Sequence, residues 1–257
     1  MKTRNILIVI CLSVSSLAAQ DANILNIMTY NLRFGELASL EDMAAFINEA
    51  KPDIVALQEC DWKTKRELAP KQNGKAFVNE LAYFTEMFGI YGKAIDYKNG
   101  YYGIGILSQY PIVRSERIFL PNPEPKTEQR VMLVADIELP DKTILTFIST
   151  HLEVSSPKTR EEQIKFINEW IKSIENPVIL AGDLNAIPSD EEIVNGFSGW
   201  KNMTNTEFTF STVDPLIKID YIYGYPENKM EMISTKVYIE SKLSDHFPVS
   251  SIISIKF

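Results

Sequence analysis

Short apolar runs separated by polar turns are the main pattern of this chain, and most of the runs predict strands. The clearest run, residues 178–181, has four apolar residues, two of them β-branched, and Gly182 after it is expected to let the chain turn before Asp183. Apolar runs of this length between turn residues are typical of buried strands. Consecutive runs between residues 101 and 150 are joined by short Pro- or Asp-containing turns, which predict antiparallel pairing. Further strands are expected at residues 24–32, 53–58, 218–223, 236–238 and 249–255.

Helical spacing occurs in a few segments between the predicted strands. It is most regular in residues 159–174, where Ile164, Ile167 and Ile171 fall on one face of a helix. Strands of mixed direction with a few covering helices predict a layered α/β sandwich. The sequence has no repeat, low-complexity tract or long linker, which favours a single domain. Shorter helices are expected at residues 41–50, 76–88 and 189–195.

The first twenty residues have the pattern of a secretory signal peptide. Lys2 and Arg4 form a basic start, residues 6–12 form an apolar centre, and small residues follow. Cleavage is expected near residues 18–20, which leaves residues 21–257 as one exported domain. The apolar centre is too short to span a bilayer.

The charge of the chain restricts the partners that it can bind. The sequence has 26 Lys and Arg against 34 Asp and Glu, a net charge of −8. Removing the signal peptide takes away two positive charges and no negative charge, so the net charge becomes −10. Such a chain is not expected to bind nucleic acid avidly without metal, although it can cleave a polyanion across a divalent cation. Cys60 is then the only cysteine, which excludes an intrachain disulfide, and we interpret it as a packing residue.

Polar side chains recur at the ends of the predicted strands. One such ending is a turn, but six of them suggest that strand ends gather around a common site. The chain has only two histidines, and both occupy positions of this kind. The polar residues at strand ends are Asn31, Arg33, Glu59, His151, Asp183, Asn185, Asp220, Ser244, Asp245 and His246.

These residue types suit the cleavage of a phosphoester. Hard oxygen ligands favour Mg²⁺ or Mn²⁺ over zinc, and such an ion neutralises charge on the phosphoryl group. Asp183 can deprotonate or orient a water, Asn185 can bond phosphoryl oxygens, and the histidines can donate to the same oxygens. Asp220 can hold one imidazole in its tautomer. The oxygen ligands are Glu59, Asn31, Asp183 and Asp245.

Taken together, these motifs resemble the endonuclease/exonuclease/phosphatase family, which has the deoxyribonuclease-I-like fold. The resemblance extends from about residue 24 to the C-terminus and implies a four-layer sandwich of two packed mixed β-sheets flanked by helices. The motifs are Asn31-Leu32-Arg33, Leu57-Gln58-Glu59, Thr150-His151-Leu152, Gly182-Asp183-Leu184-Asn185, Ile219-Asp220-Tyr221 and Ser244-Asp245-His246.

The resemblance also implies a role for each matching residue. Glu59 resembles the principal Mg²⁺ ligand, with Asn31 and Asp245 close by. Asp183 resembles the residue that activates water, and Asn185 a phosphate contact. His246, paired with Asp220, resembles the histidine that stabilises the pentacovalent state. His151 resembles a second phosphate-binding histidine.

Three arginines are further candidates for binding the substrate. Arg130 resembles an arginine of exported phosphodiesterase-like members, and it either reaches the substrate or holds a turn. Arg33 and Arg66 are similar candidates for a substrate phosphate.

The sequence therefore predicts an exported, Mg²⁺-dependent phosphohydrolase that cleaves a phosphodiester or phosphomonoester by direct attack of water. The substrate is a small phosphodiester, a lipid headgroup or a nucleic acid, no protein partner is evident, and a monomer is expected. One alternative is an exported DNA or RNA endonuclease of the same fold, and another is a binding module without catalysis. In a glycoside hydrolase, Glu59 and Asp183 would instead serve as acid and base, without need of a metal.

Overall fold

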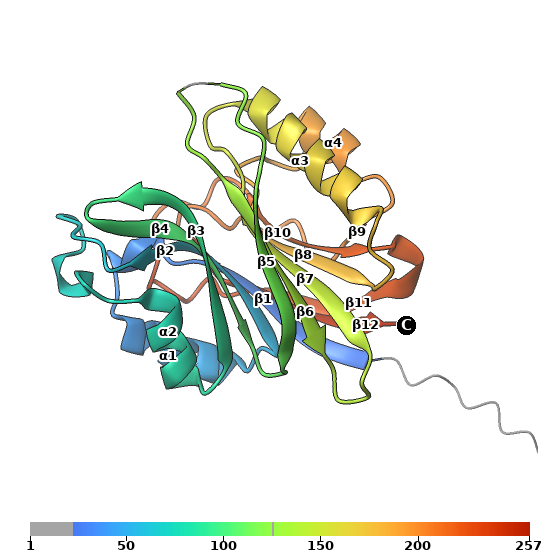
Figure 1. The fold of residues 1–257 in the computed structure, drawn as a ribbon, viewed down its shortest axis with the longest axis horizontal. Coiled ribbons are helices and arrows are strands. Elements are labelled where there is room, and N and C mark those ends of the chain that lie inside the picture. Colours follow the sequence, from blue (N-terminus) through green and yellow to red (C-terminus); the bar gives the residue numbers. More distant parts are fainter. Residues whose placement is uncertain (1–22, 125) are drawn as a thin grey trace, which may run out of the picture.

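The strands form two six-stranded sheets that pack face to face (Figure 1). The computed structural model describes residues 23–124 and 126–257, so the predicted signal peptide at residues 1–20 lies outside the described residues. In the first sheet the order is β11-β12-β1-β2-β4-β3. Its strands are β1 (Asn23–Asn31), β2 (Ile54–Trp62), β3 (Phe88–Tyr97), β4 (Gly100–Ser108), β11 (Met230–Val237) and β12 (Val249–Ile255).

The second sheet has the order β5-β6-β7-β8-β10-β9. Each sheet contains one parallel pair, β1 with β2 and β7 with β8, and the other pairs are antiparallel. Both sheets are therefore mixed, as predicted. The strands of the second sheet are β5 (Ile112–Phe119), β6 (Val131–Glu138), β7 (Ile144–His151), β8 (Val178–Asp183), β9 (Lys201–Asn202) and β10 (Asp220–Tyr225).

Helices cover the two outer faces and complete four layers. In Figure 1, α1 (Leu40–Ala50) and α2 (Phe77–Thr85) lie beside the first sheet, and α3 (Pro157–Ile171) and α4 (Glu191–Gly196) beside the second. Serine side chains cap two of these helices, because Ser39 accepts from the Asp42 N–H and Ser156 from the Thr159 N–H. None of the helices in the described part of the chain is long and apolar enough to cross a membrane. Three short 3₁₀ helices also occur, η1 (Arg33–Gly35), η2 (Pro70–Gln72) and η3 (Glu227–Lys229).

Strand β8 shows why its sequence is a continuous apolar run. Ile179 and Ala181 face the core between the two sheets, whereas Val178 and Leu180 face the layer that contains α3 and α4. Successive side chains of a strand point to opposite faces, so a strand covered on both sides has no polar position. The core of the molecule is thus built on three interfaces: sheet on sheet, and one helical layer on each outer face.

Strand β3 and the turn between β4 and β5 differ from the expected pattern. The helix predicted at residues 76–88 ends at Thr85, and the edge strand β3 follows it. Most positions of β3 are exposed or half-buried, and two are glycines, so the segment lacks the apolar run of a buried strand. Strands β4 and β5 follow each other closely but join different sheets, so the short turn between them is not a hairpin.

The register brings several strand ends to one edge of the sandwich. The parallel pairs place Asn31, at the end of β1, beside Gln58 in the middle of β2, and His151 beside Asp183 at the ends of β7 and β8. Because β10 runs antiparallel to β8, its first residue, Asp220, lies opposite Asp183. The polar residues that were predicted to gather therefore belong to adjoining strand ends.

Candidate active site

The Asp183 carboxylate is the point on which the other polar side chains converge. Its Oδ2 atom accepts a hydrogen bond of 3.0 Å from Asn31 Nδ2. The same oxygen lies 3.5 Å from His151 Nε2 and 3.6 Å from His246 Nε2. The last two distances allow electrostatic attraction but are too long for strong hydrogen bonds, so both Nε2 atoms can donate to another oxygen. Burial raises the pKa of Asp183 to about 7, although His246 opposes this shift.

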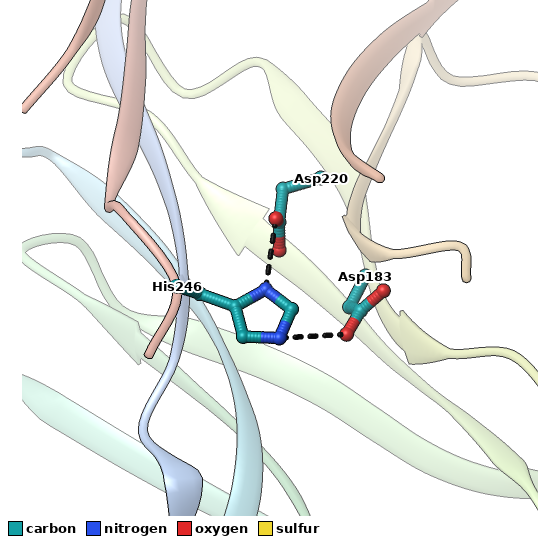
Figure 2. A group of neighbouring side chains, drawn as sticks. All are labelled: Asp183, Asp220 and His246. Atoms are coloured by element: carbon teal, nitrogen blue, oxygen red, sulfur yellow. Dashed lines mark hydrogen bonds and ion pairs between the residues drawn. The ribbon is translucent and has the colours of Figure 1, made fainter. Parts of the chain in front are cut away.

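His246 is backed by a carboxylate. Its Nδ1 atom lies 2.9 Å from Asp220 Oδ2, and its other ring nitrogen faces Asp183 (Figure 2). The ring is only 5 % exposed, and burial alone would lower its pKa. The negative charges of Asp220, Asp183 and Asp245 outweigh burial and raise the pKa of His246 to about 10. The carboxylates around His246 therefore favour its imidazolium form.

His151 is backed by a guanidinium. Its Nδ1 atom lies 3.2 Å from Nη1 of Arg130, and the ring is as buried as that of His246. Burial and the positive charges of Arg130 and His246 lower the pKa of His151 well below its usual range. His151 is therefore neutral at neutral pH.

Glu59 reaches the site through a β-bulge. The pairing of β2 with β4 shifts between Leu57 and Cys60, and Glu59 has a left-handed φ of 56°. An extra residue of this kind redirects a side chain, which the sequence pattern did not predict. The Glu59 Oε1 atom accepts from Asn31 Nδ2 at 3.2 Å, and burial raises the pKa of Glu59.

The donor set at this edge fits a hard divalent cation. Glu59 and Asp183 bring two carboxylates together around Asn31, whose Nδ2 donates to both, and the carboxylate of Asp245 raises the pKa of Glu59 by its proximity. Oxygen donors with a surplus of negative charge match Mg²⁺ or Mn²⁺. A second grouping, of Asp183, Asp220 and His246, has ligand atoms within 4.8 Å of one another. In that grouping, however, Asp220 and His246 already bond each other.

The Gly182–Asn185 segment differs from its predicted geometry. Gly182 lies inside β8 and makes no turn. A Cβ atom there would come within 2.1 Å of the Thr150 carbonyl oxygen, so a residue without a side chain is needed. The turn is made by Asn185, which has a φ of 50° and donates its N–H to Asp183 Oδ1. An Asx turn and a site residue therefore coexist in Asp183, while the Asn185 side chain donates to Leu152 O.

The three candidate arginines lie in different surroundings, each with acidic partners. Arg33 forms ion pairs with Glu36 and Asp245 and is about one-third exposed. Arg66 is fixed by Asp61 through two hydrogen bonds, of 2.7 and 3.2 Å. Rings of Phe34, Tyr97 and Tyr102 surround the Arg66 guanidinium. Arg130 is buried behind His151.

Sequence reasoning missed two residues that support the site. The Phe210 ring lies 4.8 Å from the His246 ring, centroid to centroid, and no signal in the sequence marks this contact. Lys218 is buried behind Asp220 and donates to the Asp220 carbonyl oxygen at 2.9 Å. Its position two residues before Asp220 was available in the sequence, but its burial was not.

Comparisons with known proteins agree with this geometry. The profile of the Endonuclease/Exonuclease/phosphatase family matches residues 28–246. Among solved structures, an endonuclease/exonuclease/phosphatase from Bacteroides vulgatus is similar with a TM-score of 0.74 at 19% identity, covering 91% of this chain and 100% of that chain. A mannosyl-6-phosphatase of Bacteroides thetaiotaomicron has a TM-score of 0.72 at 17% identity, covering 89% and 99%. The catalytic domain of human Nocturnin, with a bound sulfate anion, has a TM-score of 0.68 at 17% identity, covering 91% of this chain and 98% of that chain.

At these identities the structural likeness is evidence for the fold, and the family match is evidence for membership. The chain therefore belongs to the endonuclease/exonuclease/phosphatase family, whose members are metal-dependent phosphoester hydrolases.

Proposed function

We propose that this enzyme is an exported, Mg²⁺-dependent phosphohydrolase in which Asp183 activates the attacking water. The observation that carries the proposal is the convergence of Asn31, His151 and His246 on one oxygen of Asp183. A buried carboxylate with raised basicity, surrounded by donors, is an arrangement suited to taking a proton while negative charge develops beside it.

Asp183 is the proposed base. Burial raises its pKa to about 7, which makes its ionised form a stronger proton acceptor near neutral pH than an exposed aspartate. Asn31 Nδ2 bonds the Oδ2 atom and the Asn185 N–H bonds Oδ1, so the carboxylate is held in one orientation. Positioning of this kind places the water for in-line attack on the phosphorus atom.

The two histidines are the proposed donors to the phosphoryl oxygens. His246 supplies a charged N–H, which stabilises the additional negative charge of the transition state. His151 supplies a neutral N–H from the other side of Asp183. Since each Nε2 lies 3.5 Å or more from Asp183, neither proton is committed to a strong bond within the protein.

Glu59, Asn31 and Asp245 are the residues that would hold the metal ion. When bound, Mg²⁺ would neutralise charge on the transferring phosphoryl group. Glu59 has the freest carboxylate of the set, because its one hydrogen bond in the described structure comes from Asn31. Asp245 forms an ion pair with Arg33, and Asn31 Oδ1 already accepts a hydrogen bond from the Arg33 N–H.

A small phosphoester is the substrate class that we favour. The net charge of −8 disfavours tight binding to a long polyanion. A mannosyl-6-phosphatase shares this fold, which supports a sugar phosphate as one member of the class to test. A nuclease of the same fold is the alternative, and the experiment below separates the two.

Hydrolysis of a substrate panel tests the proposed function. The panel contains bis-p-nitrophenyl phosphate, p-nitrophenyl phosphate, mannose 6-phosphate, sphingomyelin and plasmid DNA, each with Mg²⁺ and with EDTA. We expect turnover of a small phosphoester that EDTA abolishes and Mg²⁺ restores. The Glu59→Gln variant should lose this turnover, whereas Glu169→Gln, at an exposed position on α3, should keep it. Preference for plasmid DNA would favour the nuclease, and turnover that survives EDTA would overturn the metal-dependent mechanism.

We also propose export and a monomeric mature chain. Export rests on the basic start and apolar centre of residues 1–20. Mass spectrometry of the protein from a secreting host should give an N-terminus near residues 19–21, and an intact Met1 in the mature protein would contradict export. Light scattering should give the mass of one chain.

A further inference from the structure

Arg130 lies directly before β6 and behind the catalytic edge, where it is only 6 % exposed. Strand β6 pairs with β7, with Met132 opposite Thr150, so Arg130 reaches the end of β7 where His151 sits. Its Nη1 atom is 3.2 Å from His151 Nδ1. Arg130 is as buried as His151, so its role follows from its contact with that ring and not from its burial.

Two carboxylates hold the guanidinium in place. Glu128 Oε1 lies 3.0 Å from Nη1, and Glu153 Oε2 lies 3.8 Å from Nε. Arg130 Nε, Glu128 Oε1 and Glu153 Oε2 have no hydrogen-bond partner, so both carboxylates meet the guanidinium as ion pairs and not through hydrogen bonds. The carboxylates of Glu128 and Glu153 therefore balance the positive charge of the guanidinium. The guanidinium also contacts a ring nitrogen of His151.

The chemistry of the two groups determines where the His151 proton resides. A guanidinium has N–H donors and no acceptor, so the Nδ1 atom that it contacts must accept. In a neutral imidazole the proton is then on Nε2. That nitrogen faces Asp183 Oδ2, an acceptor, at 3.5 Å, so both contacts of the ring require the same tautomer.

We propose that Arg130 is a positioning residue that fixes His151 as the neutral Nε2–H tautomer and so aims a hydrogen-bond donor at the phosphoryl oxygens of the substrate. The part of this inference that concerns the substrate rests on the proposed function, whereas the tautomer does not. Arg130 thus acts through His151 and does not touch the substrate. Without it, the Nδ1–H tautomer would compete and would turn a lone pair, not a proton, toward the negatively charged oxygens.

Nitrogen-15 NMR of the imidazole side chains tests the tautomer directly. The chain has two histidines, so labelling gives two sets of ring signals, and the His151→Gln variant assigns them. In the Mg²⁺-loaded protein at pH 7, His151 should show a protonated Nε2 and an unprotonated Nδ1. A protonated Nδ1 in His151, as the other tautomer or as an imidazolium, would overturn the proposal. This measurement uses the unaltered protein, so it does not depend on whether a variant folds.

Substitution of Arg130 tests whether this residue selects the Nε2–H tautomer of His151. Arg130→Met should let the His151 tautomers mix and lower kcat by about 10- to 100-fold, the usual cost of losing a partner that orients a catalytic group. Arg130→Lys keeps a donor without an acceptor and should restore the Nε2–H signal and most of kcat. Arg160→Met is the matched control, because Arg160 is equally buried and pairs with Glu192 in contact with neither histidine. An Arg130→Met protein that is folded and keeps the wild-type tautomer would overturn the proposal.

The outcomes also separate this inference from the proposed function. If the enzyme hydrolyses nothing in the panel but His151 is Nε2–H and responds to Arg130→Met, the proposed function fails and the tautomer assignment stands. If hydrolysis occurs and the tautomer is Nδ1–H, the function stands and the role of Arg130 fails.

Discussion

The two histidines of this chain are equally buried and lie at similar distances from one carboxylate oxygen, yet their surroundings shift their pKa values in opposite directions. His246 lies 3.6 Å and His151 3.5 Å from Asp183 Oδ2, through the same ring nitrogen. The difference is the group on the other nitrogen, which is a carboxylate for His246 and a guanidinium for His151. Asp220 raises the pKa of its histidine against the effect of burial, whereas Arg130 lowers it together with burial.

The group that contacts Nδ1 therefore determines the direction in which the pKa of each histidine shifts. The His246–Asp220 pair joins the two sheets, since His246 precedes β12 of the first sheet and Asp220 begins β10 of the second. The His151–Arg130 pair lies on neighbouring strand ends within the second sheet. The site can thus hold one charged donor and one neutral donor around a single base, which a pair of equivalent histidines would not provide.

The largest difference between the histidines should appear in His246→Gln. Glutamine keeps a neutral N–H but cannot carry the positive charge, so kcat should fall about 10²- to 10³-fold, as for the loss of a transition-state donor. Steady-state kinetics on the best substrate of the panel measures this. A loss of less than tenfold in a folded variant would mean that the imidazolium is not needed.

Asp220→Asn should have the next largest effect. The change removes the charge that holds His246 as an imidazolium but keeps an oxygen for its Nδ1–H, so kcat at pH 8 should fall about 10- to 100-fold. The pKa of His246 should fall toward its ordinary value, which makes the loss smaller at pH 6 than at pH 8. A loss that does not vary with pH would contradict the assigned role of Asp220.

His151→Gln should be milder than His246→Gln. Because His151 acts as a neutral donor, an amide N–H can replace it in part, and kcat should fall only about 10-fold, below the usual cost of removing a donor outright. The two glutamine variants are compared in one assay. If His151→Gln is as damaging as His246→Gln, the two histidines are not distinguished in the way that their partners imply.

The smallest effect should be on the pH dependence of stability. A raised pKa in the folded state means that His246 stabilises the protein below its ordinary pKa of 6.5, and this contribution is lost as the pH rises toward about 10. For His151 the folded pKa is lowered, so its contribution is present above 6.5 and is lost as the pH falls. The signs are therefore opposite.

Thermal unfolding of the metal-free variants between pH 5 and 9 measures this difference. The Tm gap between wild type and His246→Gln should narrow as the pH rises, and the gap for His151→Gln should narrow as the pH falls. If both Tm gaps changed in the same direction with pH, the two histidines would not differ in charge as proposed.

Much of this architecture could be predicted from the sequence, because its signals are local. Apolar runs such as Val178–Asp183 marked the buried strands, and the motifs around Asp183 and His246 indicated the family. What could not be predicted depends on contacts between distant segments. The bulge that directs Glu59 depends on how β2 pairs with β4, and β3 lacks a strand pattern because it lies at an edge.

The partner of His151 is the clearest case. Arg130 was a candidate for the substrate or for a turn, and only the pairing of β6 with β7 places it behind the imidazole. Similarly, Gly182 suggested a turn, but its role is to allow the close approach of the β7 backbone.

His246 and His151 both face Asp183, so the most direct test is turnover by the Asp183→Asn variant. Asp141→Asn is the matched control, since Asp141 is exposed in the turn that precedes β7, at the opposite end of that strand from His151. With saturating Mg²⁺ and the preferred phosphoester, we predict that kcat falls by about 10³-fold or more in Asp183→Asn, within the range for losing a general base, and stays near wild type in Asp141→Asn. A folded Asp183→Asn protein with wild-type turnover would contradict the central claim that this carboxylate activates the water.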